Sequence, residues 1–529
     1  MTQVIVAKRT ARTERPRKAL LGACLMVVAA GMAAYLMLAA NSAAHAATIF
    51  TVNLTADTPD ANLSDAVCDV NPTASDNQCT LRAAIQEANQ RTDDLADTIN
   101  FNIPTSGVAT ISPASALPTI NGPVTIDGYS QPDSSPNTLE VGDNAVLKVE
   151  LDGTKVPDAS GLNIAPNSSG SVIRGLVINR FRTGIEVDGV SSVANRIEGN
   201  FIGTDPSGTL GDRGNSEDGV LILSGPSENV VGGVTPAARN VISANGNYGI
   251  FLGQTNANLI EGNYVGTDKS GTNDLGNAFG GVSVRSASGN TVGGTTAAAR
   301  NVISANDFHG VDILGSDNKV LGNRIGTTAS GTGALGNTFA GVFIFSSTTN
   351  PSTNNFVGDG TRAGANTIAF NADDGVFVTD SSTAGNAISR NSIFSNAGLG
   401  IDLNGGVQDA AGVTANDAGD SDSGPNRLQN KPVLTSAKTV SGLTTIKGTL
   451  NSRPNQTYEL QFFSNPSGED EGKKFIGKKS VSTDGSGNAT FTFKPAAQVL
   501  VGRTITATAT RNATGDTSEF SAARQVTAS

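Results

Sequence analysis

The phrase that decides the fold of this chain is Asn195-Arg-Ile-Glu-Gly-Asn-Phe-Ile-Gly203. It returns in similar form at Asn258–Gly266 and Asn318–Gly326, at steps of 63 and 60 residues. A second phrase, Arg239-Asn-Val-Ile-Ser-Ala-Asn245, returns at Arg300–Asn306, and a degenerate copy follows at 366–371. Each repeated unit therefore contains two different half-units, and a fixed period of this length is typical of solenoids.

A finer pattern runs through both half-units, in which glycine is followed by aliphatic-x-aliphatic. It begins at Gly184, Gly219, Gly249, Gly281, Gly310, Gly341, Gly375 and Gly400. All sixteen residues one and three positions after these glycines are Val, Ile or Leu, which indicates strands with one face in the interior. The position between them varies and is expected to face outward. The glycines lie 25 to 35 residues apart, so each coil has room for two or three short strands.

These spacings predict an all-β fold, a parallel β-helix whose coils stack at about 4.8 Å. We expect it to be right-handed, as parallel crossovers almost always are. Asparagines at equivalent turns suggest stacked side-chain amides. They are Asn200, Asn263 and Asn323 in one column, and Asn245, Asn306, Asn371 and Asn396 in another.

Composition excludes several classes of protein. Glycine accounts for 62 of 529 residues, charged residues for 16%, and tryptophan is absent. Coiled coils, helical bundles and polytopic membrane proteins have a different composition.

The N-terminus predicts export. Basic residues fill positions 8–18, an uncharged and mostly apolar run covers 19–40, and Ala44-His45-Ala46 resembles a cleavage site. We expect a signal peptide over 1–46, and the alternative is an uncleaved membrane anchor. Cleavage changes the formal net charge from −11 to −16, so neither nucleic acid nor an anionic lipid surface is an expected partner.

Two cysteines remain in the mature chain, Cys68 and Cys79. In an oxidising compartment we expect them to form a disulfide rather than a metal site, because the mature chain's one histidine, His309, is distant in sequence. Leu81, Ala84, Ile85 and Ala88 then follow helical spacing, which predicts an amphipathic helix with Thr80 at its N-cap.

The run Cys79-Thr-Leu-Arg-Ala-Ala-Ile-Gln-Glu-Ala-Asn89 resembles the CSLREA motif of exported bacterial proteins, with Ala83 where that motif has Glu. The repeats resemble the β-helix repeats that commonly follow it, so the resemblance covers most of residues 48–430. It implies a surface or secreted protein and supplies no catalytic residues.

The resulting domain prediction has four parts. Residues 1–46 are the signal peptide, 47–120 the N-terminal helical cap, 121–430 the β-helix and 431–529 a second β domain. In the last part, alternating strands are expected at 444–450, 457–463, 474–483, 489–494 and 504–510. Five to seven short antiparallel strands in that length predict an immunoglobulin-like β-sandwich.

Catalytic candidates are few, because repeated residues are better explained as structural. His309, Asp373 and Asp374 are singular, and paired acids with a histidine on a β-helix invite comparison with pectin-cleaving hydrolases. The histidine comes before the acid pair here, unlike in those enzymes. His309 and Asp374 also occupy a turn position that accepts Leu399 and Gly280, so we interpret the position as a tolerant turn.

The outward stripe suggests binding instead. Phe251, Phe343 and Phe377 share its middle position, with Tyr248 nearby. Flat aromatic side chains on a solenoid face can bind sugars or proteins, and the alternative is a satellite core under the corner loops. Asp417, Asp420 and Asp422 have the spacing of a structural Ca²⁺ site, and the alternative is a solvated acidic loop.

The leading hypothesis is an exported, non-catalytic and monomeric β-helix protein, secreted or at the cell surface, that acts in adhesion or glycan binding. The alternatives are a polysaccharide lyase or glycoside hydrolase, and a structural surface spacer.

Overall fold

The computed structural model describes residues 47–74, 77–90, 95–166, 168–410 and 412–528. The predicted signal peptide, 1–46, lies outside the described residues. By its internal contacts the chain from Thr48 onward forms one compact unit. None of its described helices is long and apolar enough to cross a bilayer.

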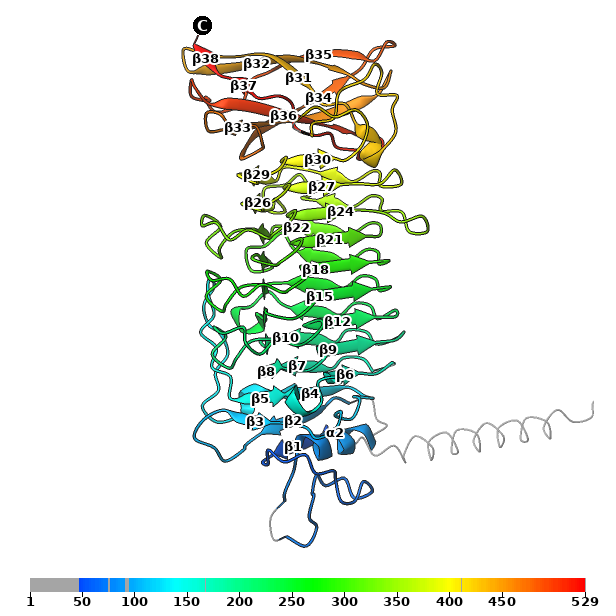
Figure 1. Cartoon of the computed structure of the whole chain (residues 1–529), viewed down its shortest axis with the longest axis vertical. Helices are drawn as coiled ribbons and strands as arrows, with labels where there is room; N and C mark the ends of the chain where they lie inside the picture. Colours follow the sequence, from blue (N-terminus) through cyan, green and yellow to red (C-terminus); the bar gives the residue numbers. More distant parts are fainter. Residues whose placement is uncertain (1–46, 75–76, 91–94, 167, 411, 529) are drawn as a thin grey trace, which may run out of the picture. The chain divides into compact units, whose positions relative to one another are not determined.

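Three long parallel sheets form the β-helix (Figure 1). The eleven-stranded sheet contains β1 Ile49–Val52, β2 Asp97–Phe101, β4 Val124–Asp127, β7 Val172–Arg174, β10 Arg196–Glu198, β13 Val230–Gly232, β16 Leu259–Glu261, β19 Thr291–Gly293, β22 Lys319–Leu321, β25 Phe356–Val357 and β28 Ala387–Ile388. The ten-stranded sheet contains β3 Ala109–Ile111, β5 Val149–Asp152, β8 Leu176–Asn179, β11 Phe201–Ile202, β14 Val241–Ile242, β17 Tyr264–Val265, β20 Val302–Ile303, β23 Arg324–Ile325, β26 Thr367–Ala369 and β29 Ser392–Phe394. The nine-stranded sheet contains β6 Ser160–Ile164, β9 Thr183–Asp188, β12 Val220–Leu223, β15 Tyr248–Gly253, β18 Gly280–Arg285, β21 Val311–Leu314, β24 Val342–Ile344, β27 Val376–Val378 and β30 Ile401–Leu403.

The core follows from the glycine-aliphatic pattern. All sixteen aliphatic residues of the pattern are buried, each at most 2% exposed, and they belong to one continuous cluster. The preceding glycines let successive coils approach closely: a Cβ on Gly249 would lie 2.5 Å from Cγ1 of Val265. Another glycine of the repeat, Gly203, has φ +90, and its Cβ would lie 2.1 Å from the carbonyl oxygen of Ser243.

Asparagines form three ladders, in which each side-chain amide donates to the Oδ1 of the asparagine in the next coil over 2.8–3.2 Å. All of them are buried except Asn396, which is half-buried. Two ladders contain the predicted columns. The third was not anticipated. The first ladder is Asn215, Asn245, Asn277, Asn306, Asn337, Asn371 and Asn396. The second is Asn200, Asn240, Asn263, Asn301, Asn323, Asn366 and Asn391. The third is Asn195, Asn229, Asn258, Asn290, Asn318, Asn355 and Asn386.

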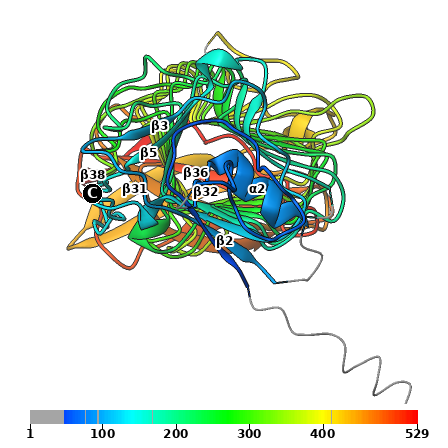
Figure 2. The same ribbon diagram turned by 90° about the horizontal axis from the view of Figure 1, so that it is seen from below.

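At the N-terminal end, helix α2 (Leu81–Gln90) lies across the first coil (Figure 2). Thr80 caps it by accepting a hydrogen bond from the Ala83 amide at 3.1 Å. Leu81 and Ile85 belong to the same core as β1 and β2. The predicted disulfide is present: Cys68 and Cys79 are joined, and both are buried.

Two four-stranded sheets follow residues 404–432, with orders β35-β32-β31-β38 and β34-β33-β36-β37. Their strands are β31 Val433–Val440, β32 Leu443–Asn451, β33 Thr457–Asn465, β34 Lys474–Ser482, β35 Asn488–Phe493, β36 Thr504–Arg511, β37 Arg524–Gln525 and β38 Thr527–Ala528. The two sheets share one hydrophobic core. The five predicted strands lie within two residues of observed ones.

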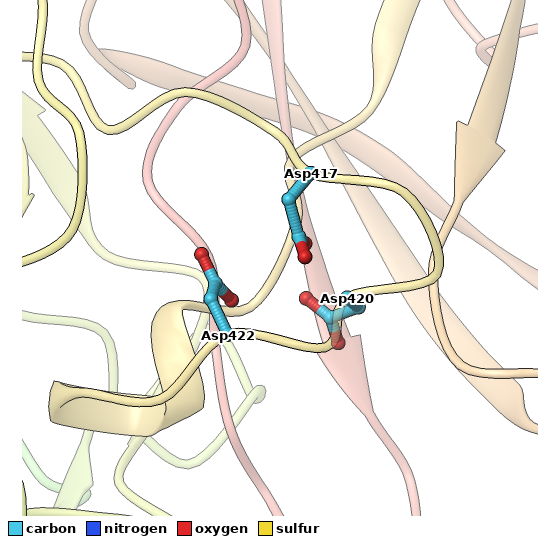
Figure 3. A group of neighbouring side chains, drawn as sticks. All are labelled: Asp417, Asp420 and Asp422. Atoms are coloured by element: carbon cyan, nitrogen blue, oxygen red, sulfur yellow. The ribbon is translucent and has the colours of Figure 1, made fainter.

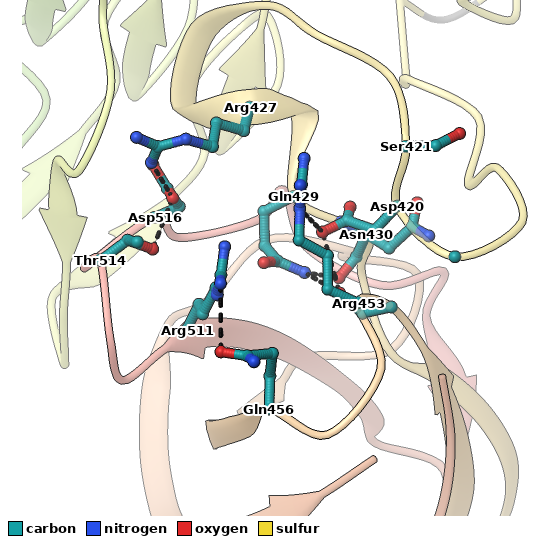
Figure 4. A network of polar contacts seen from close by, with 12 residues as sticks. Asp420, Ser421, Arg427, Gln429, Asn430, Arg453, Gln456, Arg511, Thr514 and Asp516 are labelled. Carbon is teal, nitrogen blue, oxygen red and sulfur yellow. Dashed lines mark hydrogen bonds and ion pairs between the residues drawn. The ribbon is translucent and has the colours of Figure 1, made fainter. Parts of the chain in front are cut away.

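The β33–β36 sheet meets the end of the β-helix. The Ile393 amide donates to the carbonyl of Gly472 at 3.1 Å, and the Leu403 amide donates to Glu519 at 3.3 Å. A polar network joins the connecting segment to this contact (Figure 4). In it, Asp516 pairs with Arg427 and accepts from the Gly385 amide at 2.6 Å. The last strands of the β-helix are therefore covered, as edge strands generally need to be.

Short 3-10 turns complete the structure: η1 Gly128–Ser130, η2 Gly153–Lys155, η3 Pro236–Ala238 and η4 Pro425–Leu428.

Candidate functional site

The outward face of the nine-stranded sheet is the candidate site. Parallel pairing places the variable middle positions of successive strands in one column. From β9 to β30 the column is Glu186, Leu221, Phe251, Ser283, Asp312, Phe343, Phe377 and Asp402. Regular strand pairing therefore holds one side chain per coil at this position.

Aromatic rings join into a continuous surface along this column, which we call the aromatic array. Its members are Tyr248, Phe251, Phe279, Phe308, His309, Phe339, Phe343, Phe345 and Phe377. Neighbouring ring centroids lie 4.2–5.7 Å apart, within the range of favourable aromatic pairs. Phe343 is the centre of the stacked part, with Phe345 at 4.7 Å and Phe377 at 5.4 Å.

The array is partly open to solvent. Phe279 is 42% exposed and Phe339 is 39% exposed, whereas Phe251, Phe343 and Phe377 are half-buried. Tyr248 is buried. The predicted binding residues therefore form the base of the array, and the two phenylalanines from the preceding turns form its accessible rim.

A polar centre interrupts the phenylalanines. Asp312 is buried and pairs with Arg285 over 3.2 Å, and the Ser283 hydroxyl donates to it over 2.8 Å. The Arg285 guanidinium also donates to the Tyr248 hydroxyl at 2.6 Å and lies 5.2 Å from the Phe345 ring centroid. Burial raises the pKa of Asp312, and the Arg285 charge opposes that shift. Hydrogen-bonding groups thus stand between two sets of aromatic faces.

His309 packs as an aromatic ring in this array. It stacks on Phe343 with centroids 4.4 Å apart, and it is 5% exposed. Burial lowers its pKa to about 4, despite a hydrogen bond to the carbonyl of Ala340. Its Nδ1 is buried without a hydrogen-bond partner among the described residues. With its pKa lowered this far, the enclosed imidazole is neutral at neutral pH and is not a charged general acid.

Asp374 is hydrogen-bonded to Asp402, which follows Phe377 in the column. Burial raises the pKa of Asp374 to about 6 and that of Asp402 to about 7. The negative charge of Glu519 adds to both shifts, and that of Asp374 adds to the shift of Asp402. Asp373 adds a further negative charge. Such a pair holds one proton near neutral pH. Carboxyl groups that are hydrogen-bonded to each other do not flank a glycosidic bond in the way that the acid pair of a glycosidase does.

Asp417, Asp420 and Asp422 lie together in the connecting segment, with one carboxylate oxygen from each within 4.8 Å of the others (Figure 3). Asp420 is buried, and it accepts from the Asn430 amide at 2.7 Å and the Ser452 hydroxyl at 2.9 Å. Burial raises its pKa to about 6. Carboxylates suit Ca²⁺, but a full shell needs six to eight oxygens, and Asp420 already ties the segment to the second β domain.

Sequence reasoning missed several members of this site. Phe279, Phe308 and Phe339 stand two positions before the motif glycine in three consecutive coils, a signal that was readable. The Arg285–Asp312 and Asp374–Asp402 pairs are 27 and 28 residues apart in sequence. The sequence does not predict that the two residues of each pair are in contact, because these contacts depend on the register between coils.

The comparisons with known proteins give weak likenesses. No family model matches the chain, and no curated protein matches it. Tailspike protein 2 of Escherichia coli O157:H7 bacteriophage CAB120 aligns at 10% identity over 81% of this chain and 63% of its own, with TM-score 0.21. The tailspike protein gp49 of Acinetobacter baumannii bacteriophage Fri1, described as a capsular polysaccharide depolymerase, aligns at 10% identity over 81% of this chain and 79% of its own, with TM-score 0.16. The chain thus spans less than two thirds of the first of these proteins, and likenesses this low do not bear on its function.

Proposed function

We propose that this protein is an exported glycan-binding protein that holds a polysaccharide along the aromatic array. The observation that carries the proposal is the array itself, a run of rings in van der Waals contact that surrounds the polar centre. Sugar rings have an apolar face that stacks on aromatic side chains and hydroxyls that need hydrogen-bonding partners. Phe279 and Phe339 would supply the first, and Arg285 would supply the second.

The architecture supports this proposal. We infer a right-handed β-helix with α2 as its N-terminal cap and an immunoglobulin-like sandwich as its C-terminal cap. A disulfide persists in oxidising compartments, which supports export to the cell surface or the medium. A monomer is sufficient, because each member of the array comes from a single chain.

The test removes the accessible rings. A panel of immobilised glycans is first screened for those that the wild-type protein binds. The double variant Phe279→Ala, Phe339→Ala should not bind them, because these two rings offer the largest exposed faces. Phe356→Ala is the matched control: Phe356 is 40% exposed but lies on the eleven-stranded sheet. Equal binding by the double variant and the wild type, or equal loss in the control, would overturn the proposal.

A second candidate is cleavage of the bound polysaccharide. Asp374 and Asp402 beside Phe377 have the raised pKa values of a general acid, although their arrangement is not that of a glycosidase pair. Release of reducing ends or unsaturated products from acidic polysaccharides, lost in Asp402→Asn, would support it. Retained glycan binding without any product would leave the binding function alone.

A further inference from the structure

The same corner of the β-helix has different contacts in two successive repeats. Arg239 and Arg300 are equivalent residues of the repeated phrase, and Tyr264 and Arg324 are equivalent residues of β17 and β23. Because these residues occupy the same places in their repeats, the contacts in the first repeat show what the second can accommodate.

In the first repeat a loop of the chain fills the corner. The Arg239 guanidinium donates to the carbonyls of Leu139 at 3.0 Å and Glu140 at 2.9 Å, and it also donates to the carbonyl of Gly142. Its Nε donates to the Gly262 carbonyl at 3.3 Å. The Gly142 amide donates to the Tyr264 hydroxyl at 2.7 Å. Backbone carbonyls of one loop therefore accept from both terminal nitrogens of this arginine.

In the second repeat the corner is open. The Nε of Arg300 donates to the Gly322 carbonyl at 2.9 Å, in the same way as that of Arg239. Its two terminal nitrogens have no hydrogen-bond or ion-pair partner within the described parts of the chain, and neither has the Arg324 guanidinium. Burial and the neighbouring charge of Arg300 lower the pKa of Arg324.

A cavity of about 290 Å³ lies at this place, lined by both arginines and by Arg239, Tyr264 and Val302. Small-molecule sites start at about 300 Å³, so it suits a single sugar-sized group. Glu140 is the one carboxylate among its lining residues, and that side chain is exposed. The third repeat has Ala365 and Ser392 in place of the two arginines, so it cannot form the same site.

We propose that this cavity is an oxyanion-binding site, in which Arg300 and Arg324 bind a carboxylate or sulfate, either free or carried by an acidic sugar. The occupant replaces the backbone carbonyls that fill the first repeat and adds the negative charge that two adjacent guanidinium groups require. The cavity lies over the ten-stranded sheet, away from the aromatic array of the nine-stranded sheet, so the proposal is independent of the proposed function.

The experiment is titration calorimetry of the full chain at low ionic strength with sodium sulfate, glucuronate and glucose. Sulfate and glucuronate should bind, and glucose should not. Arg300→Gln and Arg324→Tyr should each weaken binding on the order of tenfold or more, the loss expected for charge-assisted hydrogen bonds. Arg324→Tyr installs the residue of the preceding repeat, so the fold tolerates it.

Arg362→Gln is the control, because it removes an equal charge from an exposed residue close in sequence. Binding of sulfate but not glucuronate assigns the site to the free ion, and binding of both assigns it to the shared group. The proposal is overturned if neither anion binds, if glucose binds as well as glucuronate, or if Arg362→Gln weakens binding as much as Arg300→Gln.

Discussion

Single asparagine residues provide many of the hydrogen bonds that pair buried polar groups inside this protein. Asn277 shows why: its Oδ1 accepts from both the amide and the side chain of Asn245, and its own side chain donates to Asn306 and to the Ile242 carbonyl. It is completely buried. One residue thus pairs the Asn245 backbone amide in a turn and links the side chains of three successive coils.

Replacing it should therefore be costly. Asn277→Ala leaves several buried groups unpaired, each worth about 1–3 kcal/mol, so the free energy of unfolding should fall by about 3 kcal/mol or more. Urea unfolding checks this. Asn404→Ala, an exposed site, should change stability by no more than about 0.5 kcal/mol. Similar effects of the two variants would contradict the ladder's energetic role.

Glu471 ends the ladder that contains Asn277. Asn396 donates to it over 2.9 Å, and burial raises its pKa from 4.5 to about 7. Between these values the folded state holds a proton that the unfolded state has released. The stability that depends on Glu471 is therefore complete below about pH 4.5 and is lost as pH rises to about 7.

The Glu471→Gln variant should remove this dependence. A neutral amide still accepts from Asn396, so we expect the variant to gain up to about 3 kcal/mol over wild type at pH 8 and little at pH 4. Thermal or urea unfolding across that range measures the difference. Asp402 also has a pKa raised to about 7, and it contributes the same dependence of stability on pH to the variant and to the wild type. A constant difference between them at all pH values would refute this assignment.

At the scale of elements, the N-terminal cap combines a short helix with a covalent link. The ten residues of α2 are few for a helix that must be stable alone, so it depends on packing against β1 and β2. Arg82 adds an ion pair with Asp57 at 2.8 Å and a hydrogen bond to the Ala116 carbonyl at 2.9 Å. The Cys68–Cys79 link then restrains the segment that leads into the helix.

Breaking that link should loosen the cap. Closing a loop of 11 residues is worth about 3 kcal/mol in the chain-entropy account. The double variant Cys68→Ala, Cys79→Ala should lose about that amount in the opening of α2, measured by hydrogen exchange of the helix amides. Exchange in β15 should stay unchanged. Wild type treated with reductant should behave like the variant, and full protection of α2 under both conditions would contradict the prediction.

The elements were predictable where they depend on local pattern, and much less so where they depend on register. The glycine-aliphatic motif predicted the nine-stranded sheet from β9 to β30, and helical spacing predicted α2. Residues that only the stacking brings together, such as Glu471 and Asn396, were not predictable. They are 75 residues apart, and no periodicity links the second β domain to the repeats.

For the molecule as a whole, the second β domain closes the open end of the β-helix. Phe463 and Phe520 belong to the same hydrophobic cluster as the β-helix interior, and Glu471 receives the last asparagine of one ladder. The buried amide of Gln461 binds the turn before β29: its Oε1 accepts from the Arg390 amide at 2.7 Å. The domain thus covers an apolar end, a strand edge and a polar ladder at once.

Removing residues 431–529 should therefore expose all three. An uncovered end of a parallel stack presents free backbone donors and acceptors beside apolar side chains, which is a template for pairing with another chain. We expect a chain of residues 47–430 to associate end to end or to precipitate, while the chain of residues 47–529 stays in solution at the same concentration. Sedimentation velocity and light scattering distinguish these outcomes.

A point variant of the longer chain serves as the intermediate case. Phe463→Asp would put a charge into the contact between the second β domain and the β-helix, and it should increase association without removing the domain. If the shortened chain remained monomeric with an unchanged unfolding midpoint, the β-helix would close its own end and the second domain would have another role.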